Sequence, residues 1–328
     1  MRALVMIEPG DSARSQVHDV ETPHPGPGEI TIDVAYAGLN FMDVMARRGD
    51  PGYAPSWPYH PGLEVAGTVR EIGADVVGLS VGDRVAAVPA GGGLAEIATA
   101  RAGLTVPVPA EVSLRTAAAV PLGLATAMLL IAEVGRFTPG DSVLVHSASG
   151  GIGSALAQLV PLLGGGRLIG TVGRADKVAA AEKAGYDVAI LRDHVSADAI
   201  RSANDGRGVD VVLDPLGTSA LALDLDVVAT GARIVLFGNA SGGALDPLPP
   251  AGRLIGGNIT VTGFSHRGLV AGAPHRVASA VRRTLELLAA GELSFPVTEL
   301  PALADVPEAH DLLAEGRGSG KYVVRVRP

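Results

Sequence analysis

The stretch Asp141-Ser-Val-Leu-Val-His-Ser-Ala-Ser-Gly-Gly-Ile-Gly-Ser154 predicts a strand, a tight turn and a helix in direct succession. The apolar run that begins at Val143 is too short for a helix and favours a buried strand, and the residues from Ile152 to Leu163 are typical of a helix. A Gly-x-Gly-x-x-Gly pattern in this context is typical of a dinucleotide-binding turn. Its three positions are held by Ala148, Gly150 and Gly153. With alanine in the first position, the turn taken alone also fits a plain structural turn.

The glycines of this turn have separate physical roles. Gly150 would let a pyrophosphate approach the backbone, and Gly153 would let the helix pack closely on the strand. The start of the helix offers unpaired N–H groups and a partial positive charge to the phosphates. We therefore expect the phosphates to be bound by Ser149, Gly150, Gly151, Ile152 and Gly153.

The composition excludes several classes of protein. The chain has 328 residues, enough for two domains at roughly 100–200 residues per domain. Its formal net charge of −8 argues against a nucleic-acid-binding surface, and the absence of cysteine excludes disulfides, thiolate nucleophiles and cysteine-ligated zinc. The apolar run after Arg2 is too brief for a signal peptide, and the stretch Ala117–Ala132 is too short and interrupted for a membrane span. We expect a cytoplasmic protein that binds neither nucleic acid nor membrane.

The first third of the chain is predicted to be mostly β, because short apolar or alternating runs lie between turn residues there. The expected strands are Ala3–Ile7, Ile30–Tyr36, Leu63–Ile72, Arg84–Val88 and Ala95–Thr99. Such short strands with turn-rich spacing indicate a small barrel. The last part of the chain is predicted to contain a helix over Pro274–Ala290, a second helix after Asp305 and a strand over Lys321–Val326.

The middle of the chain is predicted to alternate between strand and helix. It opens with an Ala- and Leu-rich helix over Arg115–Ala132, which Pro121 and Gly123 should break. After the strand at Val143, further strands are expected at Arg167–Val172, Val188–Leu191, Val209–Leu213, Arg233–Phe237 and Ile259–Gly263. Six strands with intervening helices indicate a parallel doubly wound sheet. Pro161 should kink the helix that follows the glycine turn or end it early.

Seven segments together carry a resemblance to a known family. They are Gly38–Asp43, Pro61–Gly67, Val81–Val85, Ser147–Gly153, Asp210–Gly217, Phe237–Gly242 and Gly320–Val323. In order and spacing the chain resembles the zinc-free quinone oxidoreductase branch of the medium-chain dehydrogenase/reductase superfamily, which is similar to polyketide synthase enoyl reductase domains. The resemblance implies an α/β fold in which a Rossmann doubly wound sheet, residues 119–263, is inserted into a GroES-like β-barrel catalytic domain formed by residues 1–118 and 264–328. Alanine at the position of Ala148 is common in this branch.

The resemblance also allows a metal site to be tested. In the alcohol dehydrogenase relatives a cysteine and a histidine hold a catalytic zinc; here Asn40 stands in the place of that cysteine, and Leu63 precedes Glu64 where the histidine would be. The eight histidines show no ligand-like spacing. We therefore expect no metal, which favours reduction of an activated acceptor over oxidation of an alcohol.

The end of the second strand of the sheet indicates the cofactor. An NAD site carries an acidic residue there for the ribose 2′-hydroxyl, but this chain has Gly173, followed by Arg174 and Lys177. We expect these cations to bind the 2′-phosphate of NADPH, with Arg192 as a third candidate. The alternative is that Arg174 and Lys177 belong to a solvated helix start.

The resemblance implies a nicotinamide site in the cleft between the domains. Asn40 and Asp43 would border it, with Asn40 donating an N–H to the acceptor oxygen and Asp43 orienting Asn40 or a water. Tyr53 is a candidate proton donor, although a tyrosine in a proline-rich loop is more often a packing residue. The implied cofactor-binding residues also include Thr126, Leu216, Gly217, Phe237, Gly238, Asn239, Phe264 and Lys321.

These observations predict an NADPH-dependent, metal-free reductase of quinones or α,β-unsaturated carbonyls. Two alternatives are an enoyl-thioester reductase and an NADPH-binding protein without turnover, since a lens crystallin belongs to this branch. The last strand of the Rossmann sheet, Ile259–Gly263, should lie at an edge. Because an uncovered edge tends to pair and members of this family dimerise through it, we expect a homodimer.

Overall fold

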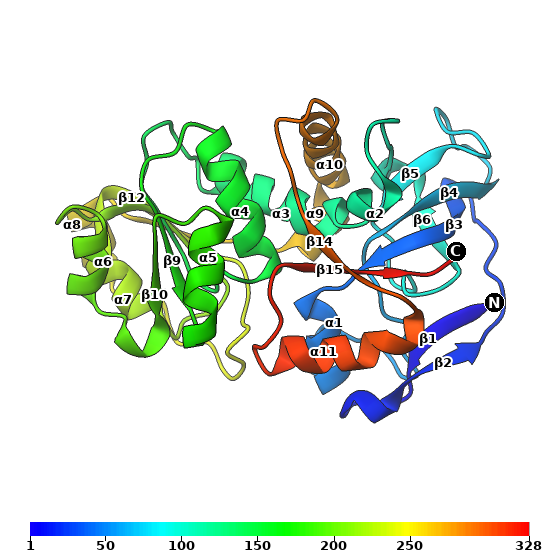
Figure 1. Ribbon diagram of the computed structural model, residues 1–328, viewed down its shortest axis with the longest axis horizontal. Helices are drawn as coiled ribbons and strands as arrows, with labels where there is room; N and C mark the ends of the chain where they lie inside the picture. The colour runs from blue at the N-terminus through cyan, green and yellow to red at the C-terminus, as the bar shows by residue number, and fades with distance from the viewer. Residues whose placement is uncertain (328) are drawn as a thin grey trace. The chain divides into compact units, whose positions relative to one another are not determined.

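The computed structural model describes residues 1–327 and divides the chain into two compact units (Figure 1). The first comprises Met1–Thr126 and the residues from Leu269 onward; the second, Ala127–Gly268, is inserted between them. These boundaries lie later in the chain than the expected 118/119 and 263/264. Both boundaries fall within helical segments, the first in Leu114–Val134 and the second in α9 (His266–Gly272).

A six-stranded parallel sheet organises the second unit, in the order β10-β9-β8-β11-β12-β13. The strands are β8 (Val143–Val145), β9 (Leu168–Val172), β10 (Val188–Leu191), β11 (Val209–Asp214), β12 (Val228–Leu236) and β13 (Thr260–Gly263). The strand order reverses beside β8, which is the point where open α/β sheets bind ligands at the carboxyl ends of their strands. The doubly wound Rossmann sheet expected from the sequence is confirmed, and β13 lies at its edge.

Helices connect the strands of this sheet. They are α4 (Gly151–Leu162), α5 (Val178–Ala184), α6 (Ala197–Ala203), α7 (Leu221–Val227) and α8 (Ala251–Gly257). All three residues of β8 are fully buried, as expected for a strand covered on both faces. Pro161 occupies the next-to-last position of α4, which ends one residue before the expected Leu163.

The first unit is built on a seven-stranded sheet that is antiparallel except between β14 and β15. Its strands are β3 (Glu29–Gly38), β4 (Val65–Ile72), β5 (Arg84–Ala87), β6 (Ile97–Arg101), β7 (Thr105–Pro107), β14 (Val297–Leu300) and β15 (Lys321–Arg325), and β1 (Arg2–Met6) pairs with β2 (Ser15–Asp19) separately. The sequence analysis missed β2, β7 and β14, which are short or exposed and lack a clear alternating pattern. Leu4, Ile30 and Ile32 are among the residues of the core of this unit.

The helical segment Leu114–Val134 is interrupted near Pro121 and Gly123, as predicted. Its first part, α2 (Leu114–Ala117), ends in a turn, and π-helical turns follow at Val120–Leu124 and Leu129–Val134. The backbone amides of Leu122 and Gly123 donate to Glu64 and not to helix carbonyls, so the regular hydrogen-bond pattern is broken there. By length and composition alone the whole segment could cross a membrane, but 83% of its most apolar window is buried within the protein, which is typical of a core helix.

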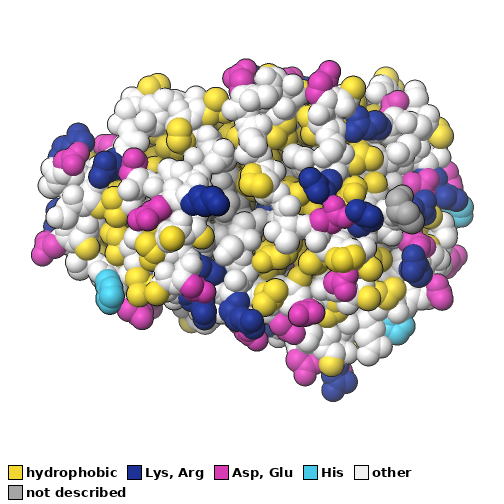
Figure 2. Space-filling model, viewed as in Figure 1, with side chains coloured by type: hydrophobic (Ala, Val, Ile, Leu, Met, Phe, Trp, Pro, Cys, Tyr) yellow, Lys and Arg dark blue, Asp and Glu magenta, His cyan; other side chains and the backbone are white. Residues whose placement is uncertain are grey.

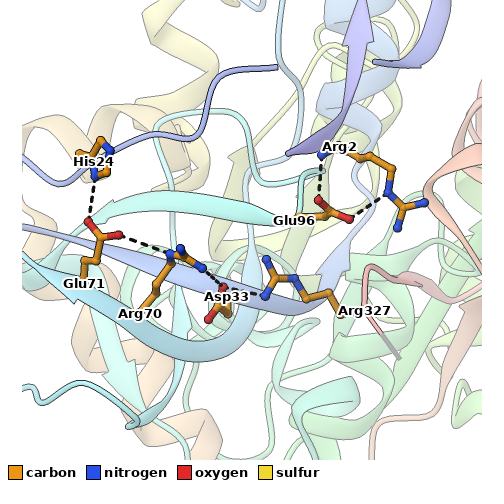
Figure 3. A network of polar contacts seen from close by, with 7 residues as sticks. All are labelled: Arg2, His24, Asp33, Arg70, Glu71, Glu96 and Arg327. Carbon is orange, nitrogen blue, oxygen red and sulfur yellow. Dashed lines mark hydrogen bonds and ion pairs between the residues drawn. The ribbon is translucent and has the colours of Figure 1, made fainter. Parts of the chain in front are cut away.

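Helices α1 (Phe41–Arg48), α10 (Pro274–Ala289) and α11 (Val306–Ala314) complete the first unit. On its surface, Asp33 of β3 accepts hydrogen bonds from Arg327 at 2.7 Å and from Arg70 at 3.3 Å, and Glu71 accepts one from His24 at 2.9 Å (Figure 3). These contacts attach the end of the chain to the sheet. Basic and acidic side chains are interspersed on the face of the molecule shown in Figure 2.

Candidate functional site

The glycine turn between β8 and α4 is closed by contacts that only small residues permit. Ser147 adopts a left-handed backbone conformation with φ +59°, and Ala148 is fully buried. A Cβ atom on Gly153 would lie 2.3 Å from the carbonyl oxygen of Ala148. A side chain at position 153 would therefore force the turn and the helix apart.

The start of α4 presents unpaired donors. The first hydrogen bond of the helix runs from Ser154 N to Gly150 O at 2.8 Å, so the amides before it have no acceptor within the helix. These are the N–H groups of Gly151, Ile152 and Gly153. Together with the helix dipole they fit the pyrophosphate of a dinucleotide. Ser149, also expected to bind phosphate, lies in the same turn and is 8% exposed.

Gly173 and Arg192, both predicted to bind the cofactor, lie beside this turn together with Ser147. Arg192 Nη2 donates to Ser147 Oγ at 3.4 Å, and a Cβ atom on Gly173 would lie 3.6 Å from Arg192 Nη1. The exposed guanidinium of Arg192 therefore lies over Gly173, where an NAD-binding sheet would carry its acidic residue.

Arg174 and Lys177 are placed differently from Arg192. Arg174 forms an ion pair with Asp176 at 3.1 Å on the surface. Lys177 is only 7% exposed, and burial lowers its pKa, with the charge of Arg174 acting in the same direction and that of Asp176 opposing it. Of the three cations, Arg192 and Arg174 are the ones that reach solvent.

The loops after β11 and β12 pack against each other. A Cβ atom on Gly217 would lie 2.7 Å from Asn239 Oδ1, and one on Gly238 would lie 2.8 Å from the carbonyl oxygen of Pro215. The remaining predicted residues of these carboxyl ends are held by backbone contacts: Leu216 N donates to Asp214 Oδ1 (2.6 Å), Phe237 N to Asp214 O (2.9 Å) and Phe264 N to Leu236 O (2.9 Å). The structure thus gathers these predicted residues at the carboxyl ends of adjacent strands.

A buried polar cluster behind the glycine turn was not predicted from the sequence. His146 contacts Thr171 Oγ1 through Nδ1 at 2.9 Å and Asp224 Oδ1 through Nε2 at 2.8 Å. Burial raises the pKa of Asp214 to about 7, helped by the charge of Asp224. Burial alone would lower the pKa of His146, but the hydrogen bond and charge of Asp224 outweigh it and raise that pKa. A histidine at the end of a buried strand was the only sequence signal for this cluster.

In the first unit, Asn40 is the N-cap of α1 and Asp43 lies one turn into the helix. The carboxylate of Asp43 accepts hydrogen bonds from Asn40 N at 2.9 Å and from Gly62 N at 3.2 Å. Asp43 is 1% exposed, and burial raises its pKa to about 6 against the opposing effect of these two hydrogen bonds. Asp43 therefore holds the backbone of Asn40, in keeping with the orienting role expected for it.

The side chain of Asn40 belongs to a buried charged cluster. Lys321 Nζ donates to Asn40 Oδ1 at 2.6 Å and to Leu39 O at 2.8 Å, and it forms an ion pair with Glu64. Asn40 Nδ2 donates to Glu64 Oε1 at 3.0 Å. Lys321 is 3% exposed and Glu64 is fully buried. The sequence analysis noted Glu64 only by its place after Leu63, although an acidic residue within an otherwise apolar run was a usable signal.

Thr126 and Tyr53 lie outside this cluster. The hydroxyl of Thr126 is buried and has no hydrogen-bond partner among residues 1–327. Such an orphaned group fits a ligand that supplies the missing partner. Tyr53 follows α1 near Asp50 and Arg48, and burial raises its pKa. Among the described residues, no hydrogen bond joins Tyr53 to Asn40 or Asp43.

Comparison with known proteins gives two matching family domains. Residues 26–110 match the alcohol dehydrogenase GroES-like domain, and residues 151–286 match a domain described as zinc-binding dehydrogenase. Within residues 1–327, no group of three or more His, Asp or Glu side chains is arranged to hold a metal ion.

Individual relatives align with nearly the whole chain. A probable quinone oxidoreductase of Schizosaccharomyces pombe is 32% identical, covering 96% of this chain and 94% of its own. A phenolphthiocerol/phthiocerol polyketide synthase subunit of Mycobacterium tuberculosis is 32% identical over 98% of this chain, which spans 15% of that subunit. The solved structure of Escherichia coli quinone oxidoreductase complexed with NADPH has a TM-score of 0.90, with 28% identity over 99% of this chain and 100% of that chain. The chain therefore belongs to the medium-chain dehydrogenase/reductase superfamily, in its quinone oxidoreductase branch.

Proposed function

We propose that the protein is an NADPH-dependent, metal-independent reductase of quinones or α,β-unsaturated carbonyls. The observation that carries the proposal is the group formed by Arg192, Gly173 and Ser147 beside the unpaired amides of α4. It offers a guanidinium, and no carboxylate, at the place where the 2′ position of the adenosine ribose is recognised in Rossmann folds. The NADPH complex of the related Escherichia coli enzyme supports the same choice of cofactor.

Arg192 and Arg174 would hold the 2′-phosphate through charge-assisted hydrogen bonds. Arg174 is already paired with Asp176 at 3.1 Å, so it must exchange one anionic partner for another. Within the described part of the chain, the one hydrogen bond of the Arg192 guanidinium is a long contact to the neutral hydroxyl of Ser147. We therefore assign the larger share of the discrimination between NADPH and NADH to Arg192.

When bound, the reduced nicotinamide supplies a hydride, which carries two electrons and one proton. The acceptor oxygen then bears negative charge, which a preorganised hydrogen-bond donor stabilises. Asn40 is proposed as that donor, and the unpaired hydroxyl of Thr126 as a contact of the nicotinamide. A second proton, taken from water, completes a hydroquinone, so no protein acid is required; an enone is protonated at carbon, where Tyr53 stays a candidate.

A second candidate function is reduction of an enoyl-thioester. The similarity to a polyketide synthase subunit over 98% of this chain favours it. A third candidate function is binding of NADPH without turnover. Sustained oxidation of the cofactor with any acceptor would contradict this third candidate. We further propose that the protein acts in the cytoplasm as a homodimer paired through β13.

The test is a screen of cofactor oxidation with NADPH and NADH against quinones, enones and enoyl-thioesters. We expect turnover with NADPH and a quinone or enone, and unchanged rates after treatment with a chelator. Turnover confined to enoyl-thioesters would establish the second candidate, and tight NADPH binding with no turnover in any arm would establish the third.

A further inference from the structure

The carboxamide of Asn40 lies between two side chains of opposite hydrogen-bonding capacity. A lysine ammonium can only donate hydrogen bonds, and an ionised carboxylate can only accept them. Lys321 approaches one end of the carboxamide at 2.6 Å, and Glu64 approaches the other at 3.0 Å. The oxygen must therefore face Lys321 and the nitrogen must face Glu64. In a flipped amide the NH2 group would face the Lys321 ammonium, donor against donor, and the oxygen would face the Glu64 carboxylate, acceptor against acceptor.

Both partners are held by further contacts. Glu64 Oε2 accepts hydrogen bonds from the backbone amides of Leu122 at 2.8 Å and Gly123 at 3.2 Å, in a π-helical turn of the long helix. Lys321 donates in addition to Leu39 O at 2.8 Å. A Cβ atom on Gly38 would lie 2.3 Å from Glu64 Oε1, so the strand before Asn40 also fits closely around the carboxylate. These contacts hold both charged groups in place beside Asn40.

One hydrogen-bond donor of Asn40 is left for a ligand. Its oxygen is occupied by Lys321, its backbone amide by Asp43, and one side-chain N–H by Glu64. The second N–H has the carbonyl oxygen of Gly38 at 3.4 Å, a length at which a hydrogen bond is weak and replaceable. Asn40 is also the member of the cluster that is partly exposed, while Glu64 and Lys321 are buried.

We infer that Glu64 and Lys321 are positioning residues that fix the Asn40 carboxamide as a donor, so that the ligand atom it holds is the carbonyl oxygen of the electron acceptor. This inference rests on the proposed function and specifies its substrate contact. The oxygen gains negative charge as hydride is added, and a fixed N–H stabilises that charge without reorienting. The ammonium on Oδ1 polarises the same amide and strengthens its N–H as a donor.

A buried ion pair is weak evidence of a stabilising role, since apolar residues of similar volume can often replace it without loss of stability. The alternative is that the cluster has a purely structural role and stabilises the packing of β15, α1 and the segment Leu114–Val134. A purely structural role would affect the stability of the fold, whereas a positioning role would affect the rate of hydride transfer and the hydrogen bonding of the Asn40 amide.

The experiment compares Lys321→Met with a matched control, Arg325→Met, which also removes a cation from β15 but breaks contacts with Glu299 and Tyr36, outside the cluster. Single-turnover hydride transfer, the Kd for NADPH and the thermal midpoint are measured for both. We expect Lys321→Met to slow hydride transfer by about 10- to 100-fold with the NADPH Kd changed less than about threefold. The control should leave hydride transfer unchanged. An unchanged rate in Lys321→Met, or a loss that tracks cofactor affinity and the thermal midpoint together, would overturn the inference.

Lys321→Met leaves a buried carboxylate without its cation, so a second variant guards against loss of folding. The double variant Glu64→Gln with Lys321→Met removes both charges at similar volume and should show the same slowing. Lys321→Arg keeps the donors and should recover part of the rate. Asn40→Asp, which keeps the shape but removes the N–H, should be at least as slow as Lys321→Met.

A readout on the protein without substrate separates this inference from the proposed function. The chain has four asparagines, so selective ¹⁵N-asparagine labelling gives few side-chain amide signals, and Asn40→Asp assigns that of Asn40. We expect the Asn40 signal to shift and its two protons to exchange faster with solvent in the double variant. If the wild-type protein reduces no acceptor, the proposed function fails, but a shifted amide signal still supports the positioning of Asn40. An Asn40 signal identical in both proteins overturns it.

Discussion

Arg192 is a single residue on which the choice of cofactor can be tested. Its guanidinium lies over Gly173 and makes one long contact, to Ser147. We expect Arg192→Ala to weaken NADPH binding by at least about tenfold, or about 1.4 kcal/mol, and to leave NADH binding nearly unchanged, because only NADPH carries the 2′-phosphate. Fluorescence titration with both cofactors measures this. Arg174→Ala should have a smaller effect of the same kind, and Arg207→Ala, on an exposed side chain of the same unit, is the control. Equal losses for both cofactors would contradict the assignment.

His310 is a second residue with a measurable consequence, this time for stability. It is fully buried in α11, and neither ring nitrogen has a hydrogen-bond partner in the described chain. Burial, together with the charge of Arg47, lowers its pKa to about 3. Since this value lies below the usual 6.5, the unfolded chain takes up the proton first, and stability falls as the pH drops below about 6.5. From pH 7 to pH 5 the loss from this group should be about 2 kcal/mol.

His310→Leu should remove that part of the pH dependence and stabilise the protein at both pH values, because it replaces an unpaired buried polar ring by an apolar side chain. Urea unfolding of both proteins at pH 7 and pH 5 measures the difference. If the wild-type protein and the variant lost the same free energy of unfolding between pH 7 and pH 5, His310 would not be held neutral in the folded protein.

At the scale of elements, the turn between β8 and α4 depends on Gly153. A Cβ atom there would lie 2.3 Å from Ala148 O, and this contact is with backbone, which cannot move aside cheaply. We expect Gly153→Ala to lower the thermal midpoint and to weaken NADPH and NADH binding by about tenfold or more, since the amides of the first turn would lose their alignment.

The matched control is Gly252→Ala in α8, where a Cβ atom would meet nothing within 4 Å. A glycine-to-alanine change in such a helix is neutral or stabilising by up to about 1 kcal/mol. If Gly153→Ala behaved like Gly252→Ala, the close packing of the turn would have no bearing on cofactor binding.

At the scale of the whole molecule, β13 leaves one edge of the parallel sheet without a strand partner among the described residues. An edge of this kind pairs readily with another strand, and a two-fold pairing would continue the sheet into a second subunit. We expect light scattering at micromolar concentration to give the mass of two 33.1 kDa chains. Thr262→Asp, which sets like charges against each other across the two-fold axis, should shift the mass toward one chain. A wild-type mass of one chain would refute the dimer.

The sequence by itself determined the order of parts and the local geometry of the cofactor turn. A buried strand, Gly150, Gly153 and an apolar helix lie within about a dozen residues, so short-range sterics and helix-end chemistry are enough to specify them. The alternation of strands and helices likewise restricts the sheet to a parallel, doubly wound form. The break at Pro121 also follows from a local rule, because proline lacks the N–H that a regular helix needs, and a π-helical turn stands at its position.

Only the tertiary structure decided which side chains meet. Asn40 and Lys321 are 281 residues apart, and Asn40 and Glu64 are 24 apart, yet they share one buried cluster. His146 meets Asp224 over 78 residues in the same way. No local pattern encodes such pairs, because they arise where strands β3, β4 and β15, or β8 and helix α7, are brought together by burial of their apolar faces. The orientation of the Asn40 carboxamide follows from that meeting, and for this reason the sequence could nominate Asn40 but not the two charges that hold it.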